Sequence, residues 1–145
     1  MRRSAMLILL LVPLACGGGS AERPGGETER WVLARVTPPV IAIKVAFARA
    51  GGSDFGRRPR PGDNDVRIEI RDLDGVPLDD LAVRVSHGPP GGGGVVSSQA
   101  EPEAGLPGTY RVSLMFETSG EWRLIVRVEG LGDGVLDLVV PERFA

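Results

Sequence analysis

Short runs of alternating apolar and polar residues constrain the fold of this chain most strongly. They recur over residues 31–145 and are separated by Gly, Pro and Asp, with 21 Gly and 12 Pro in the whole chain to supply turns. In each clear run one set of positions is apolar and the other charged or small, so one face packs and the other meets water. No stretch has a convincing helical period. We therefore predict an all-β fold, an immunoglobulin-like antiparallel β-sandwich of about seven strands.

The predicted strands follow the alternating runs. Six runs are clear, and one further short strand is predicted where the sequence reads VVSSQ. In chain order the predicted strands cover residues 41–47, 66–71, 81–85, 95–99, 110–116, 122–128 and 135–140.

The stretch GTYRVSLMFETSGEWRLIVRVEG allows two arrangements of its two strands. In a simple hairpin with both apolar sets on one face, Glu117 would lie opposite Glu121. The same register would place Arg111 opposite Arg127, and like charges directly across a ladder are unfavourable. We therefore favour an arch, in which the chain crosses from one sheet to the other at Gly120. The hairpin stays open as the alternative.

The first 15 residues have the layout of a secretory signal. Two arginines precede an apolar stretch from Met6 to Val12, and a small residue, Ala15, ends the segment. The apolar stretch is much shorter than the roughly 20 residues that a helix needs to span a bilayer. We therefore predict that residues 1–15 are a signal peptide and are removed.

Cys16, the only cysteine of the chain, directly follows this segment. Leu14 and Ala15 suit the two positions ahead of a cleavage site, and PLAC resembles the lipobox of bacterial lipoproteins, with Pro13 where leucine is usual. The resemblance implies that the thiol is diacylated and that the new amino terminus is acylated, for example with palmitate. Each buried acyl methylene contributes about 0.8 kcal/mol, so two or three chains anchor stably. The alternative is a plain signal peptide that leaves a free thiol without an internal disulfide partner.

The residues after Cys16 predict where the domain is held. Gly17 follows the cysteine, whereas aspartate there is the usual inner-membrane retention signal of lipoproteins in enterobacteria. The resemblance therefore implies an outer-membrane location facing the periplasm in a cell with two membranes. Residues 16–30 are rich in Gly and charge, and we interpret them as the lipid anchor and a flexible tether whose ends lie roughly 20 Å apart. Residues 31–145 form the domain.

The charge of the chain argues against nucleic acid as a partner. The formal net charge is −2, and loss of the two arginines of the signal takes it to −4. The loop RAGGSDFGRRPRPGDN gathers Arg57, Arg58 and Arg60 near Phe55 and could contact anionic lipid or an acidic partner. The alternative, which we favour, is a solvated loop.

Two apolar residues fall on outward-facing positions of their strands. They are Met115 and Ile125. A joined apolar patch there could mark a partner surface. Scattered surface hydrophobic residues are commoner.

Two stretches together resemble the YtkA-like (FixH-like) domain. They are PGDNDVRIEIRDLDGVPLDDLAVRV, residues 61–85, and the GTYRV…VRVEG stretch quoted above. The shared pattern runs from a Gly-Asn lead-in through a strand, an Asp-Gly-x-Pro turn and a second strand to a Gly-x-Tyr strand and a Gly-x-Trp strand. The resemblance covers about residues 61–140 and implies an immunoglobulin-like sandwich outside the cytoplasm. Likeness of fold alone does not give chemistry.

Some YtkA-like proteins are associated with copper handling or cytochrome oxidase assembly, and often carry a Met-rich motif after the second strand. Here that loop reads SHGPPGGGG, with His87 and no methionine. Soft Cu(I) sites need several thioether, thiolate or imidazole ligands. After cleavage the chain offers His87, Met115 and an acylated Cys16. His87 is thus a weak metal candidate; we expect a solvated loop residue there and predict no metal or other cofactor.

The sequence offers no set of residues for catalysis. With one histidine and no G-x-S-x-G motif there is no triad to propose. The four aspartates of DLDGVPLDD could suggest calcium, but the spacing lacks the twelve-residue EF-hand loop, and Asp and Gly also make turns. These are Asp72, Asp74, Asp79 and Asp80.

Taken together, these features predict a membrane-anchored, noncatalytic lipoprotein. It would present a binding or scaffolding domain to an unidentified protein partner in the cell envelope. The alternative, implied by the family resemblance, is an accessory protein in copper handling or cytochrome oxidase assembly.

Overall fold

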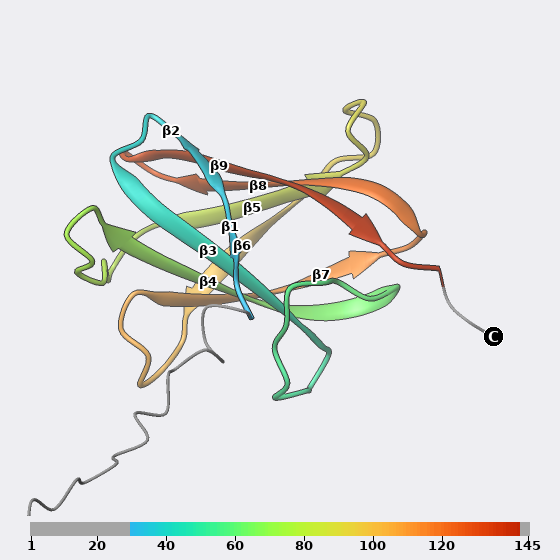
Figure 1. Ribbon diagram of the computed structural model, residues 1–145, viewed down its shortest axis with the longest axis horizontal. Helices are drawn as coiled ribbons and strands as arrows, with labels where there is room; N and C mark the ends of the chain where they lie inside the picture. Colours follow the sequence, from blue (N-terminus) through green and yellow to red (C-terminus); the bar gives the residue numbers. More distant parts are fainter. Residues whose placement is uncertain (1–29, 143–145) are drawn as a thin grey trace, which may run out of the picture.

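Nine strands make up the computed structural model of the protein, which describes residues 30–142 (Figure 1). They are β1 (Val32–Leu33), β2 (Arg35–Thr37), β3 (Ile41–Arg49), β4 (Gly62–Asp72), β5 (Val83–Gly88), β6 (Val96–Pro102), β7 (Thr109–Phe116), β8 (Gly120–Val128) and β9 (Gly132–Val140). Neighbouring strands are antiparallel, in the order β1-β3-β4-β7-β6-β5-β8-β9-β2. Over residues 30–142 no helix is long and apolar enough to cross a membrane.

Some of the sequence predictions fall outside the described residues. The predicted signal peptide, the lipidation site Cys16 and the predicted tether up to residue 29 all lie there. The domain boundaries drawn from the sequence therefore stay predictions.

The all-β, antiparallel prediction is confirmed, and every predicted strand forms. The count of about seven is too low, because β1 and β2 also form. These strands have only two and three residues, and Pro38 directly follows β2. Segments this short show no alternation to detect, and proline cannot donate to a ladder. The immunoglobulin-like arrangement stays a prediction.

Two segments change sheets and nearly close the structure into two facing layers (Figure 1). β6 pairs with β5 over Val96–Ala100 and with β7 at Glu101 and Pro102. On the other side, residues 32–37, here called the N-terminal segment, pair with β3 through β1 and with β9 through β2. One layer therefore contains β3, β4 and β7, and the other contains β5, β8 and β9.

The predicted arch between β7 and β8 is confirmed. β7 pairs with β4 and β6, whereas β8 pairs with β5 and β9, so the two strands belong to opposite layers. Gly120 begins β8 with a φ of 112°, a conformation that favours glycine. The like-charge argument does not hold throughout the sheet, however. Arg67 lies opposite Arg111, and Arg84 lies opposite Arg127.

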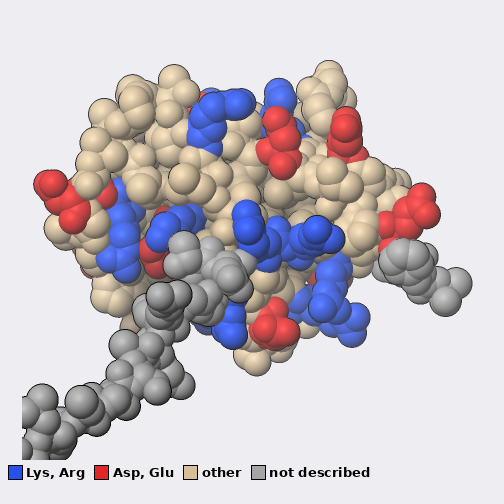
Figure 2. Space-filling view, in the orientation of Figure 1, with Lys and Arg blue, Asp and Glu red and all other residues tan. Residues whose placement is uncertain are grey.

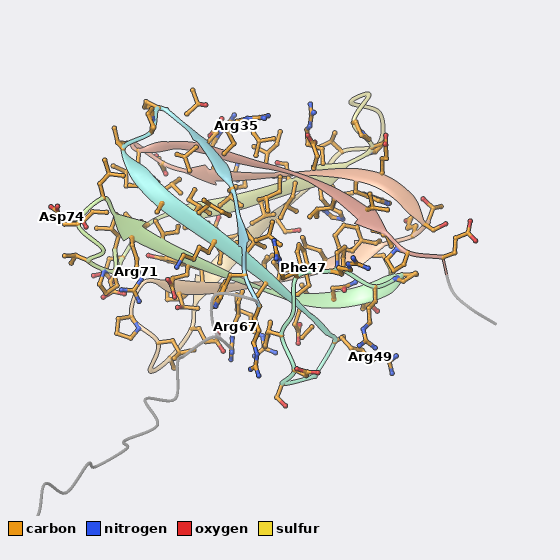
Figure 3. All side chains as sticks on the ribbon, viewed as in Figure 1. Arg35, Phe47, Arg49, Arg67, Arg71 and Asp74 are labelled. Atoms are coloured by element: carbon orange, nitrogen blue, oxygen red, sulfur yellow. The ribbon has the colours of Figure 1, made fainter. Side chains whose placement is uncertain are left out.

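The core contains the inward-facing residues of both layers. Phe47 is among them and points between the layers (Figure 3). The alternating pattern fails at Ala46 and Ala48, which are buried although they face away from this core. Phe55 of the loop before β4 packs on these two alanines, and Trp31 packs against the same cluster. The loop between β3 and β4 therefore packs against the outer face of β3.

A buried tyrosine ties the segment before β5 to β7. The Tyr110 hydroxyl donates a hydrogen bond to the Leu78 carbonyl (2.8 Å) and accepts one from the Leu81 N–H (3.1 Å). Burial raises the pKa of Tyr110, as do the charges of Asp79 and Asp80, while the Leu81 N–H lowers it; the net shift is upward. The hydroxyl therefore stays protonated and able to donate.

Candidate functional site

His87 lies in the core, so the expectation of a solvated loop residue is wrong. The side chain is 4% exposed, in β5 at the position that follows Val83 and Val85 on the inward face. Its ring stacks on Trp122 with centroids 5.8 Å apart and meets Phe116 edge-on at 5.5 Å. The loop predicted around His87 begins later than expected, because β5 extends to Gly88.

The hydrogen bonds of His87 bear on the copper alternative. Nε2 lies 2.9 Å from the Met115 carbonyl oxygen, which can only accept, so Nε2 carries the hydrogen. Nδ1 is buried and has no partner among the described residues. The Met115 side chain is 44% exposed on the outer face of β7, away from the ring. The imidazole and thioether groups of residues 30–142 therefore do not converge, and they do not fit a soft Cu(I) site.

The oxygens of the aspartate cluster accept hydrogen bonds from backbone N–H groups. Asp72 Oδ1 accepts hydrogen bonds from the N–H groups of Asp74 and Val76, each at 2.9 Å. Asp79 Oδ1 accepts one from the Gly108 N–H at 2.6 Å. In the described part of the chain, no group of three or more His, Cys, Asp or Glu side chains is placed to hold a metal ion. The Asp72 carboxylate thus has the turn-forming role typical of aspartate, whereas Asp79 joins this segment to the residue before β7.

A charged network on the outer face of β4 and β7 was not predicted from the sequence. Asp65 accepts hydrogen bonds from Arg111 (2.6 Å), Ser113 (3.1 Å) and the Gly51 N–H (2.9 Å). Glu103 pairs with Arg67 at 2.6 Å and with Arg111 at 3.7 Å. This shared carboxylate offsets the repulsion between the two arginines. The only signal in the sequence was the position of Arg67 on the polar face of the predicted strand 66–71, which begins one residue after Asp65.

The arginine-rich segment between β3 and β4 borders three neighbouring hollows. Their volumes are about 580, 830 and 460 Å³, and each is lined by Pro141 and by part of the segment 57–61. The loop is not simply solvated, because Phe55 is buried and the Arg67 guanidinium lies 4.1 Å from its ring centroid. Figure 2 shows Lys and Arg side chains gathered across the middle of this face.

The guanidinium groups at these hollows are available for a ligand. Among the described residues, no carboxylate forms an ion pair with any of the four arginines that line them. These are Arg49, Arg57, Arg58 and Arg60. An arginine fork presents several donors that match a carboxylate or phosphate group.

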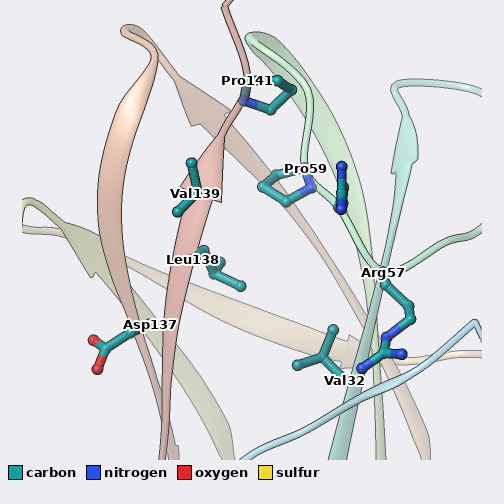
Figure 4. A pocket seen from close by; sticks show the side chains of 8 residues that line it. Val32, Arg57, Pro59, Asp137, Leu138, Val139 and Pro141 are labelled. Carbon is teal, nitrogen blue, oxygen red and sulfur yellow. The ribbon is translucent and has the colours of Figure 1, made fainter.

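The 580 Å³ hollow is a groove between β9 and the arginine-rich segment (Figure 4). One wall is formed by residues 137–139 of β9 and by Pro141. Arg57, Arg58 and Pro59 form the other wall, and Val32 lies at one end. We take this groove as the candidate functional site. Its guanidinium groups, unpaired among the described residues, suit it to holding an anionic ligand.

The apolar residues Met115 and Ile125 do not form one patch. Met115 lies in β7 and Ile125 in β8, on the outer faces of opposite layers. Ile125 is also only partly exposed. These two side chains therefore give no joined partner surface.

Replacement of Asp65 by asparagine is expected to lower the free energy of unfolding at pH 7 by about 1–3 kcal/mol. Burial raises the pKa of Asp65, but the hydrogen bonds from Arg111, the Gly51 N–H and Ser113 and the charge of Arg111 lower it by more. Because the folded-state pKa is depressed, the stabilisation is present above about pH 4 and is lost as the pH falls through the folded pKa. Urea denaturation at several pH values should therefore show the gap between wild type and variant narrowing under acid conditions.

The matched control for Asp65→Asn is Asp54→Asn. Asp54 is exposed, and no hydrogen bond or ion pair joins its side chain to a described residue. Its replacement should change stability by less than about 0.5 kcal/mol at any pH. An equal effect of the two substitutions would contradict the role given to Asp65.

Removal of the His87 ring is expected to destabilise the folded domain and to leave copper binding unchanged. His87→Ala should lower the free energy of unfolding by about 2–4 kcal/mol, because it leaves a cavity among aromatic rings. His87→Phe keeps most of the ring volume and serves if the alanine variant does not fold. Copper binding is measured by titrating the chain that begins at Gly17 with Cu(I) and with Cu(II). Micromolar or tighter binding that either substitution abolishes would contradict our interpretation.

Comparison with known proteins agrees with the resemblance stated above. The YtkA-like family model matches residues 56–127, from the arginine-rich segment before β4 to near the end of β8. No curated protein and no solved structure matches the chain. The matched region contains the first resembling stretch, all but the last three residues of the second, and the arch between β7 and β8. The chain therefore belongs to the YtkA-like domain family.

Proposed function

We propose that this protein is an exported lipoprotein, anchored through acylated Cys16, whose YtkA-like domain is a noncatalytic binding or scaffolding module in the cell envelope. In a cell with two membranes it is held at the outer membrane and faces the periplasm. The observation that carries the proposal is the position of the one cysteine, directly after a short apolar segment that begins with two arginines. A tether of roughly 20 Å then leads to the domain.

The geometry of the domain supports binding over catalysis. His87 is hydrogen-bonded to a backbone carbonyl, and Asp65 is held by Arg111, Ser113 and a backbone N–H. These polar groups serve the fold and do not converge on a cavity. The groove beside β9, by contrast, is open and bordered by guanidinium groups without described ion-pair partners.

Substitution of Cys16 by serine tests the anchor. We expect the wild-type chain to incorporate labelled palmitate in cells and to fractionate with membranes, and Cys16→Ser to lose the label. Mass spectrometry should find a mature amino terminus at Cys16 that carries a diacylglycerol and an acyl chain. As a control, Ser20→Ala changes a hydroxyl in the predicted tether and should keep the label. A mature chain with an unmodified thiol would refute the proposal.

A further inference from the structure

The edge of β9 is open along the groove. β2 pairs with β9 only at Asp133, Gly134 and Val135. Among the described residues, nothing pairs with the remaining stretch, 136–140, on the side away from β8. In an extended strand, the backbone N–H and C=O groups point alternately to the two sides, so every second residue of this stretch presents these groups away from β8. An unpaired edge of this kind is a template for another strand.

This edge is open because the N-terminal segment pairs with β9 over only three residues and otherwise pairs with β3. Continuing the β2 register backwards would bring Ala34 opposite Leu136 and Val32 opposite Leu138. Instead, the Ala34 N–H donates a hydrogen bond to the Ile43 carbonyl, and Val32 pairs with Val45 of β3. The segment thus leaves β9 at the point where the groove begins, although Val32 still lines its end (Figure 4).

We propose that the groove binds an extended peptide segment with acidic side chains, which adds to β9 as a further antiparallel or parallel strand. Backbone hydrogen bonds to residues 136–140 would give affinity, and Arg57 and Arg58 across the groove would select carboxylates. The proposal rests on the binding role stated above and names the partner class of that site.

The observations favour a peptide over the other possible occupants. Asp137, the acid that lines the groove, is exposed and paired with Arg123 at 2.8 Å, so it leaves the charge of Arg57 and Arg58 uncompensated. Pairing of β9 with β9 of a second copy would bring the same two arginines of both molecules together, which is unfavourable. An anionic lipid headgroup could meet the arginines, but it has no backbone to pair with the edge.

The test uses the chain from Gly17 to Ala145, which keeps every described residue and the complete core cluster. The probe is an eight-residue peptide in which Glu alternates with Val, and binding is measured by calorimetric titration at low ionic strength. We expect binding by the wild type and at least tenfold weaker binding by the double variant Arg57→Glu and Arg58→Glu. Arg84→Glu changes an exposed arginine of β5 and should bind as the wild type does.

Modified peptides test the strand addition itself. Replacement of Glu by Lys in the peptide should abolish binding. N-methylation of one alternate set of peptide amides should abolish it as well, whereas methylation of the other set should be tolerated, because only one set faces β9. Equal binding of both methylated peptides would overturn the proposal.

The other occupants give distinct results. A dimer of the peptide-free chain in sedimentation velocity, or binding to phosphatidylglycerol vesicles without peptide binding, would overturn the proposal. The tested chain lacks Cys16, so failure here leaves the lipid anchor untouched. Conversely, failure of the palmitate experiment would not change the result of this titration.

Discussion

The N-terminal segment pairs with β3 through β1 and with β9 through β2, and the rest of the structure depends on this shared pairing. It closes the two layers on one side, as β6 closes them on the other. Closure leaves few free strand edges, and the layers can then bury their apolar faces against each other. The segment is too short to cover both partners along their full lengths, and so part of β9 remains open beside the arginine-rich loop.

Much of the fold could be predicted because the apolar–polar alternation of a strand can be recognised within a few consecutive residues. The runs from Ile41 and from Val66 place every second side chain in the core. The arch at Gly120 was predicted from the like charges that a hairpin would place opposite each other, although like charges do lie opposite each other elsewhere in the sheet. β1 and β2 could not be predicted in this way. Two or three residues carry no period, and β2 pairs with β9, about 100 residues further along the chain.

The site was harder to predict because it depends on long-range packing. The composition of the loop raised Arg57, Arg58 and Arg60 as a possible contact for an anionic partner, but a solvated loop was favoured, because the opposite wall of the groove is β9, about 80 residues further along the chain. His87 was misjudged for a related reason. Its loop-like neighbours suggested solvent, whereas the β5 register places its ring against Trp122 and Phe116. The network around Asp65 likewise joins residues of separate strands.

The open edge of β9 is the central claim of this account, and amide hydrogen exchange of the peptide-free chain tests it most directly. Alternate amides of residues 136–140 should exchange much faster than their neighbours, which point toward β8. The amides of residues 133–135 that face β2 should be protected. Uniform protection from Asp133 to Val140 would mean that the edge is already covered, and it would contradict the account.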